Sequence, residues 1–433
     1  MLRDFQLSPG APSPAITVAP GTPAMPASYL VARWMPDRLA ALAAALRRGG
    51  EALRELPDAA LLDAWAATVE AFLDPRSPER RELAPPLAAL CGLSAAGLDA
   101  GLAAVLGGVR RDPAAALLAR AAALTGAAGA PAPVLVVLAS NLPALAVQPL
   151  LPALALRRPV LLKSPSSEPL FAPAFLAALT RREPRLAGAV AAATWPGGDA
   201  ELEAPLLAAA GAIVAYGGSE ALADLERRAA GKRFVGYGPK MSLAAIEMSA
   251  GTAPPEELAA GLARDVALFD QRGCLSVVAV YVAGGLDDAA RLAACLEAAL
   301  GDLAVRWPSG PAAAPALAAV QQLRLESELR GLPPASLPPA AGTVLLEPEP
   351  ELRPSPGLRT VRVHPLSDLD RLPEILAPWR GRLQGAALAG PAAWRLAPRL
   401  VDLGISRCAA PGDLQSPDAS WHNGGIDPLE ALS

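Results

Sequence analysis

PVLVVLASNLPALAVQPLLPALALRRPVLLK, residues 133–163, is the clearest sign of how this chain is built. It opens and closes with short apolar runs, PVLVVLA (133–139) and PVLLK (159–163), which are rich in valine and leucine. Residues 142–156 between these runs are long enough for a helix. Buried parallel strands that are joined by helices have this pattern, so the stretch predicts a strand–helix–strand unit of a parallel sheet.

The same alternation continues and predicts an α/β chain with two units. In residues 130–248, short apolar runs alternate with amphipathic stretches, which predicts a doubly wound parallel sheet with helices on both faces. The pattern restarts in residues 249–410 and predicts a second α/β unit. The further strands expected are GAVAAATW (188–195), GAIVAYGG (211–218), KRFVGYG (232–238), SLAAIEM (242–248), 275–283, GTVLLEP (342–348), RTVRVHP (359–365) and LQGAALAG (383–390); the helices are 168–182, 200–209, 219–229, 254–270, 286–300, 367–378 and 391–403.

The two ends of the chain differ from these units. Residues 1–129 contain a proline-rich, irregular and partly extended lead (1–30) and an alanine- and leucine-rich stretch (36–128) with a helical pattern. We expect this region to pack on the first α/β unit. Residues 411–433 lack a regular apolar period and predict an irregular tail with a short final helix.

Composition excludes several classes of function. The chain has 433 residues and a formal net charge of −4, so it lacks the basic excess that nucleic-acid binding needs. Its four cysteines are far apart and it has two histidines, which argues against a disulfide framework or a metal site and favours a reducing, cytoplasmic compartment. Residues 121–156 carry no charge, but five prolines interrupt them, so a buried strand and helix are expected rather than a membrane span. The first residues lack the apolar core of a signal peptide.

Cys274 stands out because of its setting in FDQRGCLS, residues 269–276. A helical pattern ends just before it, a strand-like run begins just after it, and Gly273 precedes it. A cysteine thiolate is a strong nucleophile for thioesters and aldehydes, and a backbone amide beside a glycine can help to hold an oxyanion. The alternative, a small side chain buried at the edge of a strand, is equally compatible with these residues.

Further polar residues and glycines follow successive expected strands. Asn141 suits an oxyanion, Lys163 suits a ribose or phosphate, and the turn at Gly218 and Ser219 places a serine to cap the next helix, whose N-terminus would then face an anion. Gly238 lies in another such loop. Each has an ordinary structural alternative, such as a turn asparagine, a lysine that reaches solvent or a capped helix without ligand. Because ligands of open α/β sheets bind at the carboxyl ends of the strands, these loops are expected to converge on one cleft.

The order of these motifs resembles the aldehyde dehydrogenase superfamily, and within it the LuxC-like acyl-CoA reductases. The similar segments are FDQRGCLS, SNLPALAVQPLLPALALRRPVLLKSP, AYGGSEAL (215–222) and LGISRCAAPGDLQSPDASWHNGG (403–425), and the resemblance covers about residues 130–433. It implies a Rossmann-like cofactor domain (130–248), a catalytic domain (249–410), a C-terminal tail (411–433) and a helical N-terminal region (1–129). It also implies that an acyl group moves from a thioester to a cysteine and that a nicotinamide cofactor then reduces it to aldehyde.

The resemblance assigns roles to the residues singled out above. Cys274 would be the acylated nucleophile, and Asn141 would share the oxyanion hole with the Cys274 backbone amide. Lys163 would meet the adenosine ribose or its phosphate, and Gly218 and Ser219 would lie against the pyrophosphate. Hydrolytic relatives carry a glutamate just before a Gly-Gly-Lys motif; the corresponding segment here is GYGPK (236–240), and the position that matches the glutamate is about Gly236. Without that base water competes poorly for the acyl-enzyme, which favours reduction over hydrolysis.

A second departure concerns the cofactor. Relatives that prefer NAD often have a glutamate three residues after the lysine, and this chain has Ser166 there, which favours NADPH and leaves NADH as the alternative. Glu168 is close enough in sequence to reverse that preference. A glutamate for the nicotinamide ribose is not clearly placed, with Glu347 and Glu351 as the candidates.

Three other residues are expected to be structural. His422 is favoured as a surface or capping residue over a proton donor. Cys408 and Cys295 are expected to be inert, because the first has no base beside it in sequence and the second lies in an apolar helical run.

The sequence therefore predicts an NADPH-dependent reductase that converts an acyl thioester, with a fatty acyl group favoured, to an aldehyde. The acyl donor would be acyl-CoA or an acyl-carrier thioester, an acyl-protein synthetase is a further partner that family members use, and a homo-oligomer is expected. An aldehyde dehydrogenase that oxidises aldehyde to acid, and a non-catalytic protein with this fold, remain as alternatives.

Overall fold

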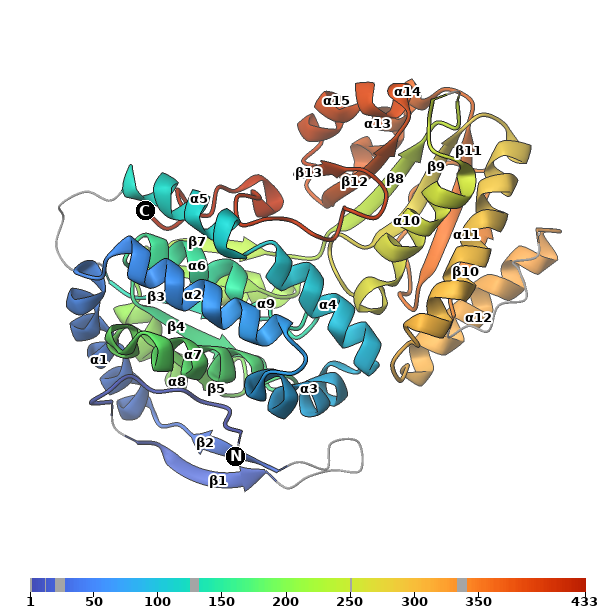
Figure 1. Cartoon of the computed structure of the whole chain (residues 1–433). Coiled ribbons are helices and arrows are strands. Elements are labelled where there is room, and N and C mark those ends of the chain that lie inside the picture. Colours follow the sequence, from blue (N-terminus) through green and yellow to red (C-terminus); the bar gives the residue numbers. More distant parts are fainter. Residues whose placement is uncertain (1, 12, 20–27, 125–131, 250, 333–340) are drawn as a thin grey trace.

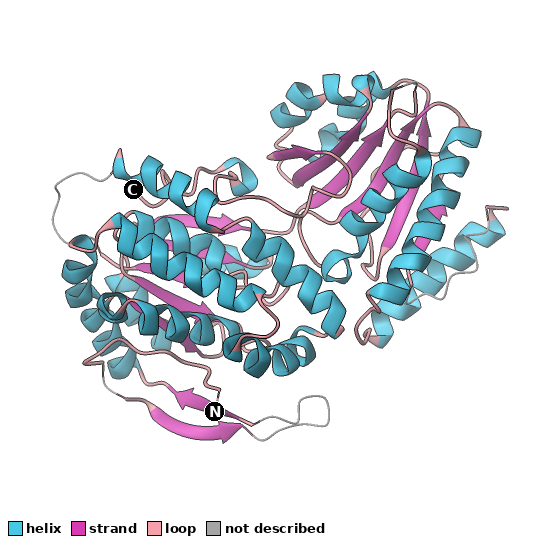
Figure 2. Ribbon diagram, viewed as in Figure 1, coloured by secondary structure: helices cyan, strands magenta, loops and turns pink. Residues whose placement is uncertain are grey.

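The computed structural model describes the whole chain except residues 1, 12, 20–27, 125–131, 250 and 333–340. The chain forms two lobes, and each is built on a parallel sheet with helices on its faces (Figures 1 and 2). The C-terminal segment, residues 411–433, runs from the second lobe back to the first (Figure 1).

The first sheet has five parallel strands in the order β5-β4-β3-β6-β7. The order reverses between β3 and β6, and ligands of doubly wound sheets bind at such a switch point. The strands are β3 (Val134–Val137), β4 (Val160–Ser164), β5 (Val190–Thr194), β6 (Ala212–Tyr216) and β7 (Arg233–Tyr237). Residues 133–163 form β3, α6 (Val147–Ala155) and β4. The expected doubly wound unit is confirmed.

Helices cover both faces of this sheet because its side chains alternate between two cores. In β3, Val134 and Val136 pack with α2 to α7, whereas Leu135 on the opposite face packs with α1, α8 and α9. The helices are α1 (Pro36–Arg54), α2 (Asp58–Leu73), α3 (Pro78–Cys91), α4 (Ala95–Gly107), α5 (Arg111–Ala122), α6 (Val147–Ala155), α7 (Phe171–Arg182), α8 (Ala200–Ala209) and α9 (Ser219–Arg228). The N-terminal helices therefore pack on the first sheet, as the sequence predicted.

No single helix in the described part of the chain is long and apolar enough to cross a membrane. One pair, residues 78–91 with 95–122, passes the same test of length and composition only when taken together, and it is bent by 104°.

The second sheet has six parallel strands in the order β10-β11-β9-β8-β12-β13. These strands are β8 (Met241–Ile246), β9 (Val277–Ala283), β10 (Thr343–Leu346), β11 (Thr360–Leu366), β12 (Leu383–Ala389) and β13 (Arg407–Ala409). Strand β8, which the sequence analysis placed inside the first unit (130–248), pairs with β9 and β12 instead. The chain changes sheets within the three residues between Tyr237 and Met241, and no helix separates β7 from β8 to signal the change.

Helices again lie on two faces of the second sheet. Helices α10 (Pro255–Ala267) and α11 (Leu286–Arg306) pack on one face, and α13 (Leu372–Leu376), α14 (Pro391–Arg395) and α15 (Ala397–Asp402) pack on the other. Helix α12 (Ala314–Leu329) has no counterpart among the expected elements. It buries only Val320 and Ser327, so its sequence lacks a continuous apolar stripe.

The two ends of the chain compare differently with the sequence expectation. The lead was expected to be irregular and partly extended, and its extended part is an antiparallel ribbon of β1 (Ala15–Ala19) and β2 (Tyr29–Arg33). Residues 428–432 form turns rather than a final helix. The C-terminal segment is nonetheless anchored, because Leu429 and Leu432 are buried in the core of the first lobe.

Candidate active site

The segment before Cys274 has an unusual backbone. Phe269, Asp270 and Gln271 have φ values of 58°, 51° and 63°, in the left-handed region that side chains with a Cβ rarely adopt. Each such residue costs on the order of 1–3 kcal/mol, so the surrounding structure must hold the segment in place. This strained turn ends α10 and leads the chain to Cys274 before β9 begins.

Buried side chains hold the turn. Asp270 accepts hydrogen bonds from Arg359 at 2.7 and 3.1 Å and from the backbone of Gly310 at 3.0 Å. The Gln271 amide donates to the carbonyl oxygens of Val277 and Thr360 at 2.9 and 2.8 Å, and its oxygen accepts from the Thr360 N–H at 2.8 Å. Residues of two strands of the second sheet, β9 and β11, therefore help to fix the position of Cys274.

Cys274 is partly exposed and lies among backbone donors. Its carbonyl oxygen accepts a hydrogen bond of 2.8 Å from the Ser242 hydroxyl. Burial raises the pKa of the Cys274 thiol to about 11, against the effect of its own N–H, the charge of Lys240 and the Leu275 N–H. The resting thiol is thus protonated at neutral pH. The two backbone N–H groups and Lys240 counteract the rise in pKa because they stabilise a thiolate at this position.

One cavity joins several of the residues predicted from the sequence. Cys274, Asn141, Gly218 and Gly238 all line a cavity of about 620 Å³ between the lobes. The other three predicted site residues, Lys163, Ser166 and Ser219, are not part of its lining. Among the described residues, the charged side chains that line it are both cationic, Lys240 and Arg272. The Arg272 guanidinium is directed to the carbonyl oxygens of Cys91 and Gly92.

Asn141 lies next to the cysteine turn. Its Nδ2 donates a hydrogen bond of 3.1 Å to the carbonyl oxygen of Arg272, two residues before Cys274. This bond orients the amide and uses one of its two N–H donors, which leaves the second available to a ligand. This bond connects the loop that follows β3 in the first lobe with the turn that leads to Cys274 in the second lobe.

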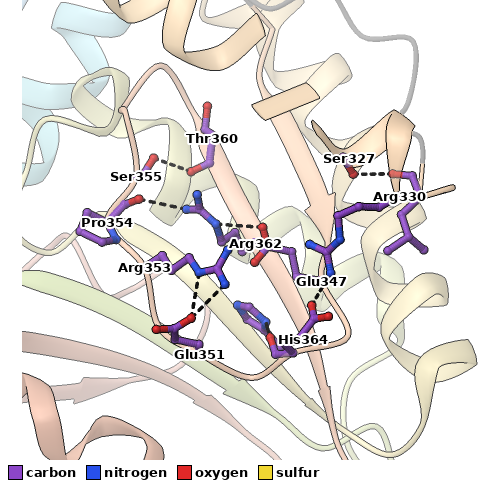
Figure 3. A network of polar contacts seen from close by, with 12 residues as sticks. Ser327, Arg330, Glu347, Glu351, Arg353, Pro354, Ser355, Thr360, Arg362 and His364 are labelled. Carbon is purple, nitrogen blue, oxygen red and sulfur yellow. Dashed lines mark hydrogen bonds and ion pairs between the residues drawn. The ribbon is translucent and has the colours of Figure 1, made fainter. Parts of the chain in front are cut away.

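A polar network supports another wall of the cavity, formed by Pro354, Ser355, Pro356 and Gly357 (Figure 3). Ser355 Oγ donates to the Thr360 carbonyl at 2.8 Å, and Arg362 donates to the Pro354 carbonyl at 3.0 Å. These bonds hold the loop against β11.

The two glutamates considered for the nicotinamide ribose are engaged elsewhere in this network. Glu347 is buried and accepts from Arg362 Nε at 3.1 Å, and Glu351 pairs with Arg353 at 2.9 Å (Figure 3). Neither belongs to the cavity lining.

The turn after β6 differs in detail from the expectation. The N-cap of α9 is Gly218 and no side chain caps this helix, so Ser219 is its first residue rather than its cap. A glycine N-cap leaves the first-turn N–H groups without a side-chain acceptor, which suits an anion, although Glu220 in the same turn opposes one.

Lys163 is buried at the end of β4. Its Nζ lies 5.9 Å from the centre of the Trp195 ring, and burial lowers its pKa, against the effect of Glu203.

Glu168 is bound to the backbone at the start of α7. Its carboxylate accepts hydrogen bonds from the Leu170 and Phe171 N–H groups at 2.9 and 2.8 Å, at the start of α7. It is buried, and burial raises its pKa to about 7. The carboxylate that the sequence offered as an obstacle to a 2′-phosphate is thus committed to the backbone, and Ser166 is exposed.

The sequence did not place Lys240, Gln415 or Trp421 in the cavity wall. Lys240 was considered only as part of GYGPK, and Gln415 and Trp421 only as part of a tail segment. Gln415 Nε2 donates to the Asp265 carbonyl at 2.6 Å and Trp421 Nε1 donates to the Ser406 carbonyl at 3.2 Å, so the C-terminal segment is held against the cavity. The only signal in the sequence was that this segment resembles the family.

Residues expected to be structural lie outside the cavity lining. His422 is half exposed and its Nε2 lies 3.3 Å from Asp427. Cys408 lies in β13, where burial raises its pKa to about 11. Cys295 lies on α11, and its Sγ is 4.0 Å from Glu256.

Two parallel-sheet lobes with a cysteine between them define the aldehyde dehydrogenase fold, and solved structures agree. The chain matches an aldehyde dehydrogenase of Mycobacterium tuberculosis with a TM-score of 0.72 and 14% identity, over 98% of this chain and 95% of that one. It matches the NADP-dependent glyceraldehyde-3-phosphate dehydrogenase of Bacillus halodurans at 0.71 and 13%, over 95% and 90%. For the indole-3-acetaldehyde dehydrogenase AldA of P. syringae the values are 0.71 and 15%, over 98% and 91%.

The family is defined more closely by sequence. The model of the LuxC acyl-CoA reductases matches residues 126–433, so the chain belongs to this family. It is therefore an oxidoreductase that acts on aldehyde or acyl groups. No curated protein matches the sequence.

Proposed function

We propose that this protein reduces an acyl thioester to an aldehyde through an acyl-enzyme on Cys274, with NADPH as reductant. The observation that carries the proposal is that Cys274 lines the same cavity as Asn141 and the Gly218 turn. A nucleophile, an amide donor and the turn for a dinucleotide thus share one space. Gly236 stands where hydrolytic relatives have a glutamate base, and this supports reduction of the acyl-enzyme over its hydrolysis.

The chain's residues account for the acylation step. The Cys274 sulfur attacks the thioester carbonyl carbon, and the bond from that carbon to the donor sulfur breaks. The donor leaves as a thiolate that takes up a proton. The oxyanion formed on the way accepts hydrogen bonds from the free N–H of Asn141 and from the Cys274 backbone. The Asn141 amide is oriented by its bond to the Arg272 carbonyl, and Ser242 holds the Cys274 carbonyl, so the site needs little reorganisation.

The residues around the cleft fit a nicotinamide dinucleotide. The uncapped first turn of α9 would receive the pyrophosphate, and Lys163 would meet the adenosine ribose or its phosphate. Bound there, the cofactor would supply the hydride that turns the cysteine thioester into aldehyde. The neutral Ser166 and the backbone-bound Glu168 support NADPH, because no carboxylate from this loop would repel a 2′-phosphate.

The lining of the cavity supports an apolar acyl group. Val105, Leu142, Leu145 and Trp421 contribute apolar surface on the side of α4, α6 and the C-terminal segment. We propose a fatty acyl chain carried by CoA or by a carrier protein, with an acyl-protein synthetase as a further partner. A cytoplasmic homo-oligomer completes the proposal.

Covalent labelling tests the nucleophile. Purified protein is incubated with an acyl-CoA in the absence of NADPH, and its intact mass is measured. Wild type should gain the mass of one acyl group, Cys408→Ala should gain the same, and Cys274→Ala should gain none. An acylated Cys274→Ala would overturn the assignment. Addition of NADPH should then release aldehyde, and release of free acid would point to a hydrolytic enzyme instead.

A further inference from the structure

Lysine is rare in this chain, and one of its lysines lines the candidate site. Only three of the 38 basic residues are lysines, namely Lys163, Lys232 and Lys240. Lys232 is exposed and its ammonium group donates to the Ala208 carbonyl at 2.8 Å. Lys163 is buried in β4 outside the cavity lining, and Lys240 lines the cavity that holds the cysteine. In a chain that otherwise uses arginine, the role of Lys240 needs an explanation.

The backbone places Lys240 next to the nucleophile. It directly precedes β8, and Ser242, two residues later, donates its hydroxyl to the Cys274 carbonyl at 2.8 Å. Lys240 and Cys274 line the same cavity, and the charge of Lys240 acts on the Cys274 thiol. Its Nζ also borders the C-terminal segment, because a Cβ added at Gly424 would be 3.5 Å away.

The ammonium group of Lys240 has no protein acceptor within the part of the chain that the structure describes. Burial lowers the pKa of Lys240, and the neighbouring Cys274 sulfur works against this change. A half-buried cation that faces a cavity without a carboxylate partner is costly unless an anion forms beside it.

We infer that Lys240 is the charge partner of the Cys274 thiolate, an inference that rests on the proposed function. The ammonium group stabilises the anionic sulfur before it attacks the thioester and again when the aldehyde leaves. Ionisation releases the thiol proton to solvent, and Lys240 keeps its own protons, so the pair changes from thiol and ammonium to thiolate and ammonium. What this role needs is a positive charge that can reach the sulfur, and the flexible stem of a lysine allows this.

The other titratable groups near the sulfur do not provide this charge. Tyr216, at the end of β6, interacts with Cys274 and stacks on Tyr237 at 4.8 Å, and burial raises the pKa of both phenols. Both are neutral near neutral pH. The Arg272 guanidinium donates hydrogen bonds to the backbone carbonyl oxygens of Cys91 and Gly92. Lys240 is thus the cation that remains for the sulfur among the described residues of the cavity wall.

The test measures the ionisation of the resting thiol directly. The full-length protein, without cofactor or substrate, is treated with iodoacetamide over a range of pH, and alkylation of the Cys274 peptide is followed by mass spectrometry. The thiolate sulfur bonds to the reagent carbon and iodide leaves, so the rate reports the thiolate fraction. The variants are Lys240→Met, Lys240→Gln and Lys240→Arg, with Lys232→Met as the control.

Removal of the charge should lower the alkylation rate at neutral pH, where Lys240 is protonated, by about tenfold. Lys240→Arg and Lys232→Met should remain near wild type. Profiles of Lys240→Met and Lys240→Gln that coincide with wild type would overturn the inference, as would an equally lowered rate in Lys240→Arg. The alkylation assay measures no acyl transfer, so a result that overturns this inference would not contradict the proposed function. Acylation of Cys274→Ala would contradict the proposed function itself.

Discussion

Arg359 donates two hydrogen bonds to a single oxygen of Asp270, from Nε at 3.1 Å and from Nη2 at 2.7 Å, and both side chains are almost fully buried. Asp270 is the middle residue of the left-handed turn that leads to the nucleophile. The ion pair therefore holds the strained turn against the start of β11 in the second sheet. Residues far from the chemistry can fix the position of the sulfur in this way.

Loss of the arginine should destabilise the protein strongly. Arg359→Met leaves a buried carboxylate without its partner, which typically costs about 3–5 kcal/mol. The free energy of unfolding is measured by urea denaturation. Arg353→Met is the matched control, since it removes the exposed pair with Glu351 and should cost less than about 1 kcal/mol. Equal losses in the two variants would show that the buried pair does not hold the turn.

Gly273 requires the absence of a side chain for a different reason. A Cβ at this position would lie 2.8 Å from Gln415 Oε1, and Gln415 is itself held by a hydrogen bond to the Asp265 carbonyl. Gly273→Ala must therefore displace either the C-terminal segment or the nucleophile. We expect kcat to fall about 10²-fold, since misplacement of a reacting group by about 1 Å has that effect.

The control for this variant is Gly107→Ala in α4, where an added methyl group meets nothing within 4 Å. It should keep the wild-type rate. If Gly273→Ala retains full activity, contact between the C-terminal segment and Gly273 does not determine where the sulfur lies.

The sequence predicted the two α/β units and the family because short apolar strands and the cysteine motif are local signals. It placed β8 in the wrong unit, because a change of sheet within three residues leaves no helix between β7 and β8. It also expected Ser219 to cap a helix that begins with Gly218 as its N-cap. Lys240 and Gln415 could not be assigned to the site, since each reaches the cavity through contacts between segments that are distant in the chain.

Asn141 offers a test of the oxyanion site. Asn141→Ala removes the amide that is oriented by the Arg272 carbonyl, and we expect kcat to fall about 10²–10³-fold, the usual effect of losing one oxyanion donor. The KM for the cofactor should not change. Asn423→Ala serves as the control, because this second cavity amide accepts from Gln384 at 2.7 Å and should lose less than tenfold. A larger loss in Asn423→Ala would place the oxyanion elsewhere in the cavity.

Asp265 makes stability depend on pH. This fully buried carboxyl accepts from the Gly412 N–H at 2.7 Å, and burial raises its pKa from 3.8 to about 7. Between these values the folded protein binds a proton that the unfolded chain releases, so stability falls as the pH rises from about 4 to about 7. Glu168 and Asp4, whose pKa values are raised to about 7 and about 6, act in the same direction, and His364, whose pKa is lowered, opposes them.

A substitution separates the contribution of Asp265 from these others. The Tm of wild type should fall more between about pH 5.5 and about pH 8 than the Tm of Asp265→Asn, which cannot titrate. Asp302→Asn, which changes an exposed aspartate on α11, should follow wild type. Parallel profiles for all three proteins would contradict the assignment of this pH dependence to Asp265.

Leu432 links the far end of the chain to the cavity. It is buried in the core of the first lobe, and the segment that it anchors contributes Pro417, Trp421 and Asn423 to the cavity wall. Leu432→Ala should cost about 2–5 kcal/mol of stability through the space it leaves. Because the looser segment no longer shapes the wall, we also expect the KM for the acyl donor to rise several-fold while acylation of Cys274 persists. Leu329→Ala on α12, an 80% exposed leucine, should change neither quantity, and a wild-type KM in Leu432→Ala would mean that Trp421 is held by its own contacts in the second lobe.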